Sequence, residues 1–178
     1  DATAPCSVYG RTKLAGEQAA LAAPQALVLR LSWVFGRRGG NFARTMLKLA
    51  AERDQLKVVN DQIGAPTGAD LLADVTAHAL MRLRATPELA GTYHCVAAGE
   101  ASWFDYARHV IEWARAAGAS LRLPATGLLP VPSSEFPTAA ARPLNSRLST
   151  RKLRETFGLV PPLWTVGVER MLAEIHGR

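Results

Sequence analysis

The 178-residue sequence has little cysteine, and Cys6 and Cys95 lie too far apart to form a paired metal-binding or disulfide motif. We therefore expect two buried thiols in a reducing compartment. The four histidines are widely scattered and gather no carboxylate cluster around them. The sequence therefore indicates no metal site.

Long apolar runs and clusters of basic residues are also missing. No stretch of about eighteen apolar residues occurs, and the N-terminus lacks the basic-then-apolar layout of a signal peptide. We therefore expect a cytoplasmic protein with no membrane contact. The formal charge is +6, but Lys and Arg are spread along the chain, which argues against nucleic acid as a partner. A substrate with two phosphates would suit this mild positive charge.

A third absence is the Gly-rich dinucleotide fingerprint that follows the first strand of a Rossmann fold. The Gly-rich run at 36–40 follows a later strand with the wrong spacing, and we interpret it as a flexible active-site loop. The sequence also begins with Asp1 rather than Met. We expect an upstream half to be missing, and we expect the chain alone to bind a dinucleotide poorly and to be inactive.

What the sequence does contain is an alternation of helical and extended patterns, which predicts an α/β fold. Ser102 is the expected N-cap of one helix, with Asp105 in the capping-box position. The expected helices are 7–23, 41–55, 69–83, 102–117, about 150–158 and 165–175, and the expected strands are 26–31, 56–59 and 91–96.

The first expected helix carries Tyr9 and Lys13 one turn apart, on the same face. A phenol normally titrates near pH 10, but a fixed cation at this distance favours the phenolate. Tyr9 could then protonate a carbonyl oxygen while a hydride reaches the carbonyl carbon. The same spacing also occurs on surface helices without catalytic function, so the pair alone leaves both interpretations open.

The residues around this pair carry a resemblance to a known family. Residues 5–17, PCSVYGRTKLAGE, resemble the Tyr-Gly-x-[Ser/Thr]-Lys-x-x-Gly-Glu signature of extended short-chain dehydrogenases. Four further blocks follow in order, at 29–36 (LRLSWVFG), 41–46 (NFARTM), 61–67 (DQIGAPT) and 142–148 (RPLNSRL). Together they are similar to the dTDP-4-dehydrorhamnose reductase family over nearly the whole chain.

The resemblance implies roles for the first candidate residues. Tyr9 would donate a proton to the C4 keto group, and Lys13 would support the phenolate and hydrogen-bond the nicotinamide ribose. Ser32 and Trp33 would lie beside the nicotinamide and the sugar, where a flat indole can pack against a deoxysugar. Core packing stays open as the alternative for Trp33.

Five further residues are candidates for the substrate. Asp61, Gln62 and Thr67 flank a Gly-Pro turn that could present groups to the thymidine diphosphate end, with turn and cap formation as the alternative. Arg142 and Arg147 are candidates for the pyrophosphate, because guanidinium groups bond phosphate oxygens in pairs. Solvation at the surface is the alternative for either arginine.

The resemblance also implies the fold and the activity. The fold would be the latter part of a Rossmann-type doubly wound parallel sheet with a smaller mixed α/β substrate-binding lobe. Residues 1–60 would complete the dinucleotide-binding domain, and 61–178 would form mainly the substrate lobe, interleaved with a returning Rossmann segment. The activity would be NADPH-dependent reduction of dTDP-4-dehydro-L-rhamnose to dTDP-L-rhamnose for the synthesis of surface polysaccharide (O-antigen). NADH is a possible alternative to NADPH, and a homodimer is a possible assembly.

Two other functions fit the same pattern. A nucleotide-sugar epimerase or dehydratase would share Tyr9 and Lys13, and the 61–67 block is what favours the reductase. A non-catalytic subunit, such as the β regulatory subunit of methionine adenosyltransferase, resembles the same reductases. The intact Tyr9 and Lys13 favour catalysis over that role.

Overall fold

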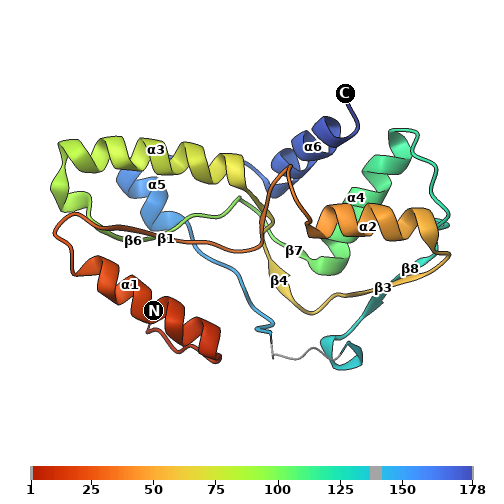
Figure 1. Ribbon diagram of the computed structural model, residues 1–178, viewed down its shortest axis with the longest axis horizontal. Helices are drawn as coiled ribbons and strands as arrows, with labels where there is room; N and C mark the ends of the chain where they lie inside the picture. Colours follow the sequence, from red (N-terminus) through yellow and green to blue (C-terminus); the bar gives the residue numbers. More distant parts are fainter. Residues whose placement is uncertain (1, 137–141, 178) are drawn as a thin grey trace.

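The computed structural model describes residues 2–136 and 142–177 and shows an α/β arrangement (Figure 1). The helices are α1 (Val8–Leu21), α2 (Phe42–Glu52), α3 (Ala69–Ala85), α4 (Trp103–Ala116), α5 (Arg151–Phe157) and α6 (Trp164–Ile175), with short 3-10 turns η1 (Pro87–Leu89) and η2 (Ser133–Glu135). The strands are β1 (Leu27–Arg30), β2 (Val34–Phe35), β3 (Leu56–Val59), β4 (Ile63–Gly64), β5 (Thr67–Gly68), β6 (Gly91–His94), β7 (Ala101–Ser102) and β8 (Leu128–Val131).

The α/β class expected from the sequence is confirmed, and the expected helices and strands are all present with slightly different ends. The capping box at the start of α4 is confirmed as well, since Ser102 accepts from the Asp105 backbone and Asp105 accepts from the Ser102 backbone. The sequence did not predict β2, β4, β5, β7 and β8. Most of these have two residues, too few for a periodic pattern.

The β1–β6 pair forms one half of the molecule and is parallel, with Arg30 opposite His94. Helices α3 and α5 lie on one face of this pair and α1 lies on the other, on the left of Figure 1. Tyr93 and Cys95 pack there against Leu153 and Phe157 of the α5 segment. Parallel strands with helices on both faces are the Rossmann-type arrangement that the sequence predicted.

The second half is built on α2, α4 and α6 around an aromatic core (Figure 1). Tyr106, in the first turn of α4, is 1% exposed and contacts Phe42, Trp103 and Trp164. The parallel pair β3–β8 completes this side. The β2–β5 pair is also parallel, whereas β4 and β7 are antiparallel.

The β1–β6 and β3–β8 pairs each join a segment before residue 60 to a segment after it. Strand pairing thus crosses residue 60 and does not by itself divide the chain there. The expected division into 1–60 and 61–178 stays a prediction. The expectation of two buried thiols is wrong for Cys6, which is exposed because it lies ahead of α1 with nothing packed over it. Cys95 is buried, and burial raises the pKa of its thiol to about 11.

Candidate functional site

Tyr9 and Lys13 lie in the first half of α1, which begins after Ser7. The Ser7 side chain accepts a hydrogen bond of 3.0 Å from the Gly10 backbone, as an N-cap does. The Lys13 ammonium lies 5.4 Å from the centre of the Tyr9 ring, so the two side chains share a helix face. Tyr9 is 71% exposed, which leaves its phenol open to a reacting partner.

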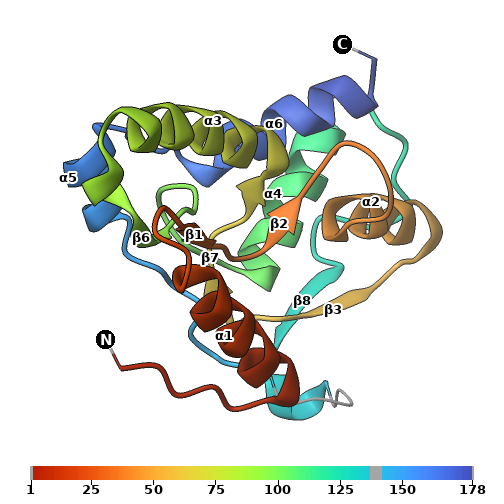
Figure 2. The ribbon, with the colours of Figure 1, turned by 60° about the vertical axis from the view of Figure 1, so that its left-hand side comes forward.

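Helix α1 runs back along the β1–β6 pair, because only the short segment 22–26 connects its end to the start of β1 (Figure 2). Glu17 accepts two hydrogen bonds from Arg30, the last residue of β1, at 2.7 and 2.9 Å. These bonds hold the pKa of the Glu17 carboxyl below its usual value and raise that of Arg30. Since Tyr9 lies two helical turns before Glu17, it lies beyond the carboxyl end of β1.

Ser32 and Trp33 follow β1 at that same end. Ser32 is half-buried, and its hydroxyl makes no hydrogen bond with another residue of the described ranges. Trp33 has a left-handed backbone, with φ of 47°, which is uncommon for a bulky residue and marks a constrained position. The Trp33 carbonyl accepts a hydrogen bond of 3.1 Å from the Thr67 backbone, which ties this loop to β5.

The Trp33 indole is covered by its neighbours. Trp103 stacks on it, with ring centres 3.9 Å apart and planes 15° apart. A Cβ on Gly64 would lie 2.7 Å from Cε2 of Trp33, so the Gly64 backbone also packs directly against the indole. A sugar could therefore meet Trp33 only at its free edge, or after the stack with Trp103 opens.

A cavity of about 340 Å³ lies between α2, β3 and the start of α4. Aromatic and aliphatic side chains and two cations line it, together with one buried amide, that of Gln62. The sequence analysis identified Gln62 and Arg142 among the lining residues and missed the others, because no local pattern brings them together. The full lining is Phe42, Met46, Lys57, Val58, Val59, Gln62, Trp103, Phe136 and Arg142.

Asp61 and Gln62 both bond to Ser133, at the start of the η2 turn. The Asp61 carboxylate accepts from the Ser133 hydroxyl at 2.5 Å and from its backbone at 2.8 Å, and these bonds hold the pKa of Asp61 below its usual value. Gln62 donates to the same hydroxyl at 2.9 Å. Asp61 is thus engaged in fixing one end of the cavity wall, while Gln62 also faces the cavity.

Thr67 and Arg147 lie in different surroundings. Thr67 is 0% exposed; its hydroxyl donates to the Ala65 carbonyl and accepts from the Ala97 backbone. It therefore braces the Gly-Pro turn from inside and offers no group at the surface. Arg147 is half-exposed and is paired with Glu100 at 3.1 Å, and it does not line the cavity that Arg142 lines.

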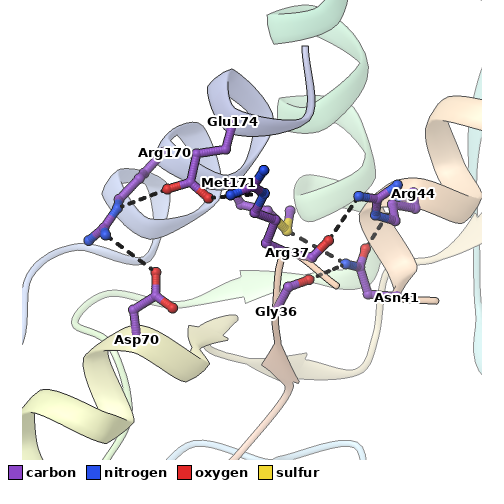
Figure 3. Close-up of polar contacts among 8 residues, drawn as sticks. All are labelled: Gly36, Arg37, Asn41, Arg44, Asp70, Arg170, Met171 and Glu174. Atoms are coloured by element: carbon purple, nitrogen blue, oxygen red, sulfur yellow. Dashed lines mark hydrogen bonds and ion pairs between the residues drawn. The ribbon is translucent and has the colours of Figure 1, made fainter. Parts of the chain in front are cut away.

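The Gly-rich loop at 36–40 is held by several contacts rather than left free (Figure 3). The Asn41 amide donates to the Gly36 carbonyl at 2.7 Å, and Arg44 donates to the Arg37 carbonyl at 2.8 Å. Arg37 also meets Glu174 of α6 at 3.8 Å. These contacts hold the start of the segment, at Gly36 and Arg37, and its interpretation as a flexible active-site loop stays a prediction.

No group of three or more His, Cys, Asp and Glu side chains gathers in residues 2–136 and 142–177. Within the same ranges, no helix is both long enough and apolar enough to cross a membrane.

The parallel strands, the flanking helices and a Tyr-x-x-x-Lys pair beyond the end of β1 define the class of the Rossmann-type short-chain dehydrogenases. The chain belongs to the RmlD substrate binding domain family, whose family model matches residues 1–176. The family resemblance and the Rossmann-type fold expected from the sequence are therefore confirmed.

The individual relatives are reductases and related enzymes. The dTDP-4-dehydrorhamnose reductase of Salmonella typhimurium is 54% identical over 176 residues, which cover 98% of this chain and 58% of that protein. The crystal structure of the Bacillus anthracis dTDP-4-dehydrorhamnose reductase in complex with NADP is 36% identical, with a TM-score of 0.81, over 98% of this chain and 58% of that one. The chain thus spans about 58% of the length of these relatives.

A more distant structure shares the fold alone. The UDP-glucuronic acid 4-epimerase from Bacillus cereus is 19% identical, with a TM-score of 0.73, over 99% of this chain and 55% of that one. The fold by itself therefore does not separate a reductase from an epimerase.

Proposed function

We propose that the complete natural polypeptide containing this chain reduces dTDP-4-dehydro-L-rhamnose to dTDP-L-rhamnose with NADPH. The observation that carries the proposal is the exposed Tyr9–Lys13 pair beyond the end of β1, in a chain 54% identical to a reductase of that name. We also propose that this reaction takes place in the cytoplasm and supplies the synthesis of surface polysaccharide. A homodimer is part of the proposal as well.

Tyr9 and Lys13 fit the nicotinamide end of the dinucleotide, because both are exposed and neither forms an ion pair or hydrogen bond through its side chain with another described residue. When bound, the dinucleotide supplies a hydride to C4 of the sugar. Tyr9 then donates its phenolic proton to the C4 oxygen, and the Lys13 ammonium stabilises the phenolate left behind. Ser32, with its free hydroxyl, would orient the reacting groups. NADH is the alternative to NADPH as the hydride donor.

We place the thymidine diphosphate portion of the substrate in the 340 Å³ cavity. Trp103 and Phe42 offer flat apolar surfaces for a base, and Arg142 and Lys57 offer positive charge for phosphate. Gln62 supplies a polar group in the wall. Arg147 lies outside this cavity, so a pyrophosphate contact from it requires that its ion pair with Glu100 opens.

The test is NADPH oxidation by the complete polypeptide in the presence of dTDP-4-dehydro-L-rhamnose. We expect Tyr9→Phe to lower kcat by about 10²- to 10⁴-fold, because the proton donor is removed. Gln18→Ala changes another exposed residue of α1 and should leave turnover within about twofold of wild type. Wild-type protein that binds NADPH but does not reduce the sugar would favour the epimerase or the regulatory subunit instead.

A further inference from the structure

Glu17 and Arg30 belong to the sequence blocks that carry the family resemblance but have no part in the chemistry above, and they bond to each other. Glu17 ends the block that contains Tyr9, and Arg30 belongs to the block that contains Ser32 and Trp33. The carboxylate of Glu17 and the guanidinium of Arg30 form two parallel hydrogen bonds, at 2.7 and 2.9 Å. This fork-to-carboxylate geometry fixes direction as well as distance.

The pair is the main polar anchor of α1. Within the described residues, this helix has no buried residue, so apolar packing against the rest of this chain does little to fix its position. Among the hydrogen bonds and ion pairs of the described residues, only those of Glu17 connect a side chain of α1 to another element, through Arg30 and, at 3.5 Å, Thr92. The Glu17 side chain is only 14% exposed, which shields these bonds from water.

The Glu17–Arg30 pair lies between the two parts of the candidate site, the Tyr9–Lys13 face of α1 and the Ser32–Trp33 loop. Tyr9, Lys13 and Glu17 follow at four-residue intervals on one helix face, and the distance along the axis from Tyr9 to Glu17 is about 12 Å. On the other side of the pair, Ser32 is two residues beyond Arg30, within about 7 Å along an extended chain. A shift at the pair therefore moves the proton donor relative to Ser32 and Trp33.

We propose that Glu17 and Arg30 are positioning residues that hold the Tyr9–Lys13 face of α1 in register with the Ser32–Trp33 loop. This inference rests on the proposed function for its effect on turnover. The pair acts on kcat, because misplacing a catalytic group by about 1 Å costs up to about a hundredfold. Binding of the sugar nucleotide depends on the separate cavity beside α2 and α4 and is not affected.

The structure offers a matched control. Arg122, between α4 and β8, and Asp54, between α2 and β3, form another pair with two hydrogen bonds, at 2.6 and 2.8 Å, on the surface. Asp54→Asn therefore removes the same kind of interaction without touching α1, β1 or the cavity lining. Arg30→Lys serves as a milder variant, since lysine keeps the positive charge but cannot donate two parallel hydrogen bonds to the Glu17 carboxylate.

The experiment uses the complete polypeptide with Glu17→Gln, Arg30→Met, Arg30→Lys, the Glu17→Gln/Arg30→Met double variant and Asp54→Asn. We measure kcat and KM for the sugar nucleotide, together with hydrogen exchange of the α1 and α4 amides. We expect each severe single variant to lower kcat about tenfold with KM within about twofold. The double variant should match the worse single one, because the two residues act through each other. Arg30→Lys should retain more activity than Arg30→Met, and amide exchange should accelerate in α1 but not in α4.

Three results would overturn the proposal: unchanged kcat despite faster exchange in α1, an equal loss in Asp54→Asn, or additive losses in the double variant. If wild type itself reduces no sugar, the proposed function fails, and hydrogen exchange alone decides whether the pair holds α1. In that case, α1 exchange as slow in Glu17→Gln and Arg30→Lys as in wild type overturns the positioning role. Arg30→Lys also provides the readout if Arg30→Met does not fold.

Discussion

Helices α1 and α4 have the same length, 14 residues, and both begin after a serine whose side chain accepts a backbone hydrogen bond. They differ in burial. Helix α1 has no buried residue, whereas α4 buries five, Tyr106, Ala107, Val110, Ile111 and Ala114. The two residues that we propose for acid-base chemistry, Tyr9 and Lys13, lie on the exposed helix.

The difference in burial indicates that α4 and α1 have different roles in the chain. Side chains of α4 stabilise the fold by removing apolar surface from water. Side chains of α1 remain accessible, and the helix is held by one polar pair, Glu17 and Arg30. Substitutions on α1 should therefore change activity more than stability, and substitutions on α4 should change stability first.

The largest stability difference should come from truncating apolar side chains on the two helices. Ile111→Ala in α4 removes a side chain that is 3% exposed and packs with Leu56 and Leu123. We expect it to lower the free energy of unfolding by about 2–5 kcal/mol. Val8→Ala in α1, where Val8 is 67% exposed, should change it by less than about 0.5 kcal/mol. Urea unfolding of the 178-residue chain measures both, and equal effects would remove the contrast between the helices.

Glycine-to-alanine substitutions at Gly64 and Gly16 should change the free energy of unfolding in opposite directions. Gly64→Ala places a Cβ 2.7 Å from the Trp33 indole, and the shift that this forces disturbs the stack with Trp103, at an expected cost of about 1–3 kcal/mol. Gly16→Ala on α1 meets nothing within 4 Å and should stabilise by about 0.5–1 kcal/mol, because alanine favours helix. Near-UV circular dichroism of the stacked tryptophans should change only in Gly64→Ala. An unaltered spectrum in that variant would contradict the packing argument.

The sequence was sufficient for features determined by neighbours along the chain. A four-residue spacing predicted that Tyr9 and Lys13 share a helix face, and a three-residue spacing predicted the capping box of Ser102 and Asp105. Both depend on helix geometry alone. The α/β class followed in the same way from alternating periodic segments.

Features that depend on distant segments were not accessible from local patterns. Trp103 stacks on Trp33 across about 70 positions of sequence, and Asp61 meets Ser133 across a similar separation. Thr67 occupies an expected site block, yet its hydroxyl is enclosed by Ala65 and Ala97. Which residues of a block reach the surface is decided by tertiary packing, which no spacing rule reports.

The smallest expected effect is the pH dependence of the pair that holds α1. Arg30 lowers the pKa of Glu17 from its ordinary value of 4.5, so the folded state binds the proton less tightly than the unfolded state. The stabilisation is therefore present above about pH 4.5 and is lost as the pH falls through the lower folded pKa. Glu17→Gln should cost about 1 kcal/mol at pH 7, and its difference from wild type should shrink toward zero in acid. Chemical unfolding of both proteins at pH 7, 5 and about 3 provides the test. A difference that stays constant across this range would mean that the Glu17 carboxylate contributes no charge interaction to holding α1 against β1.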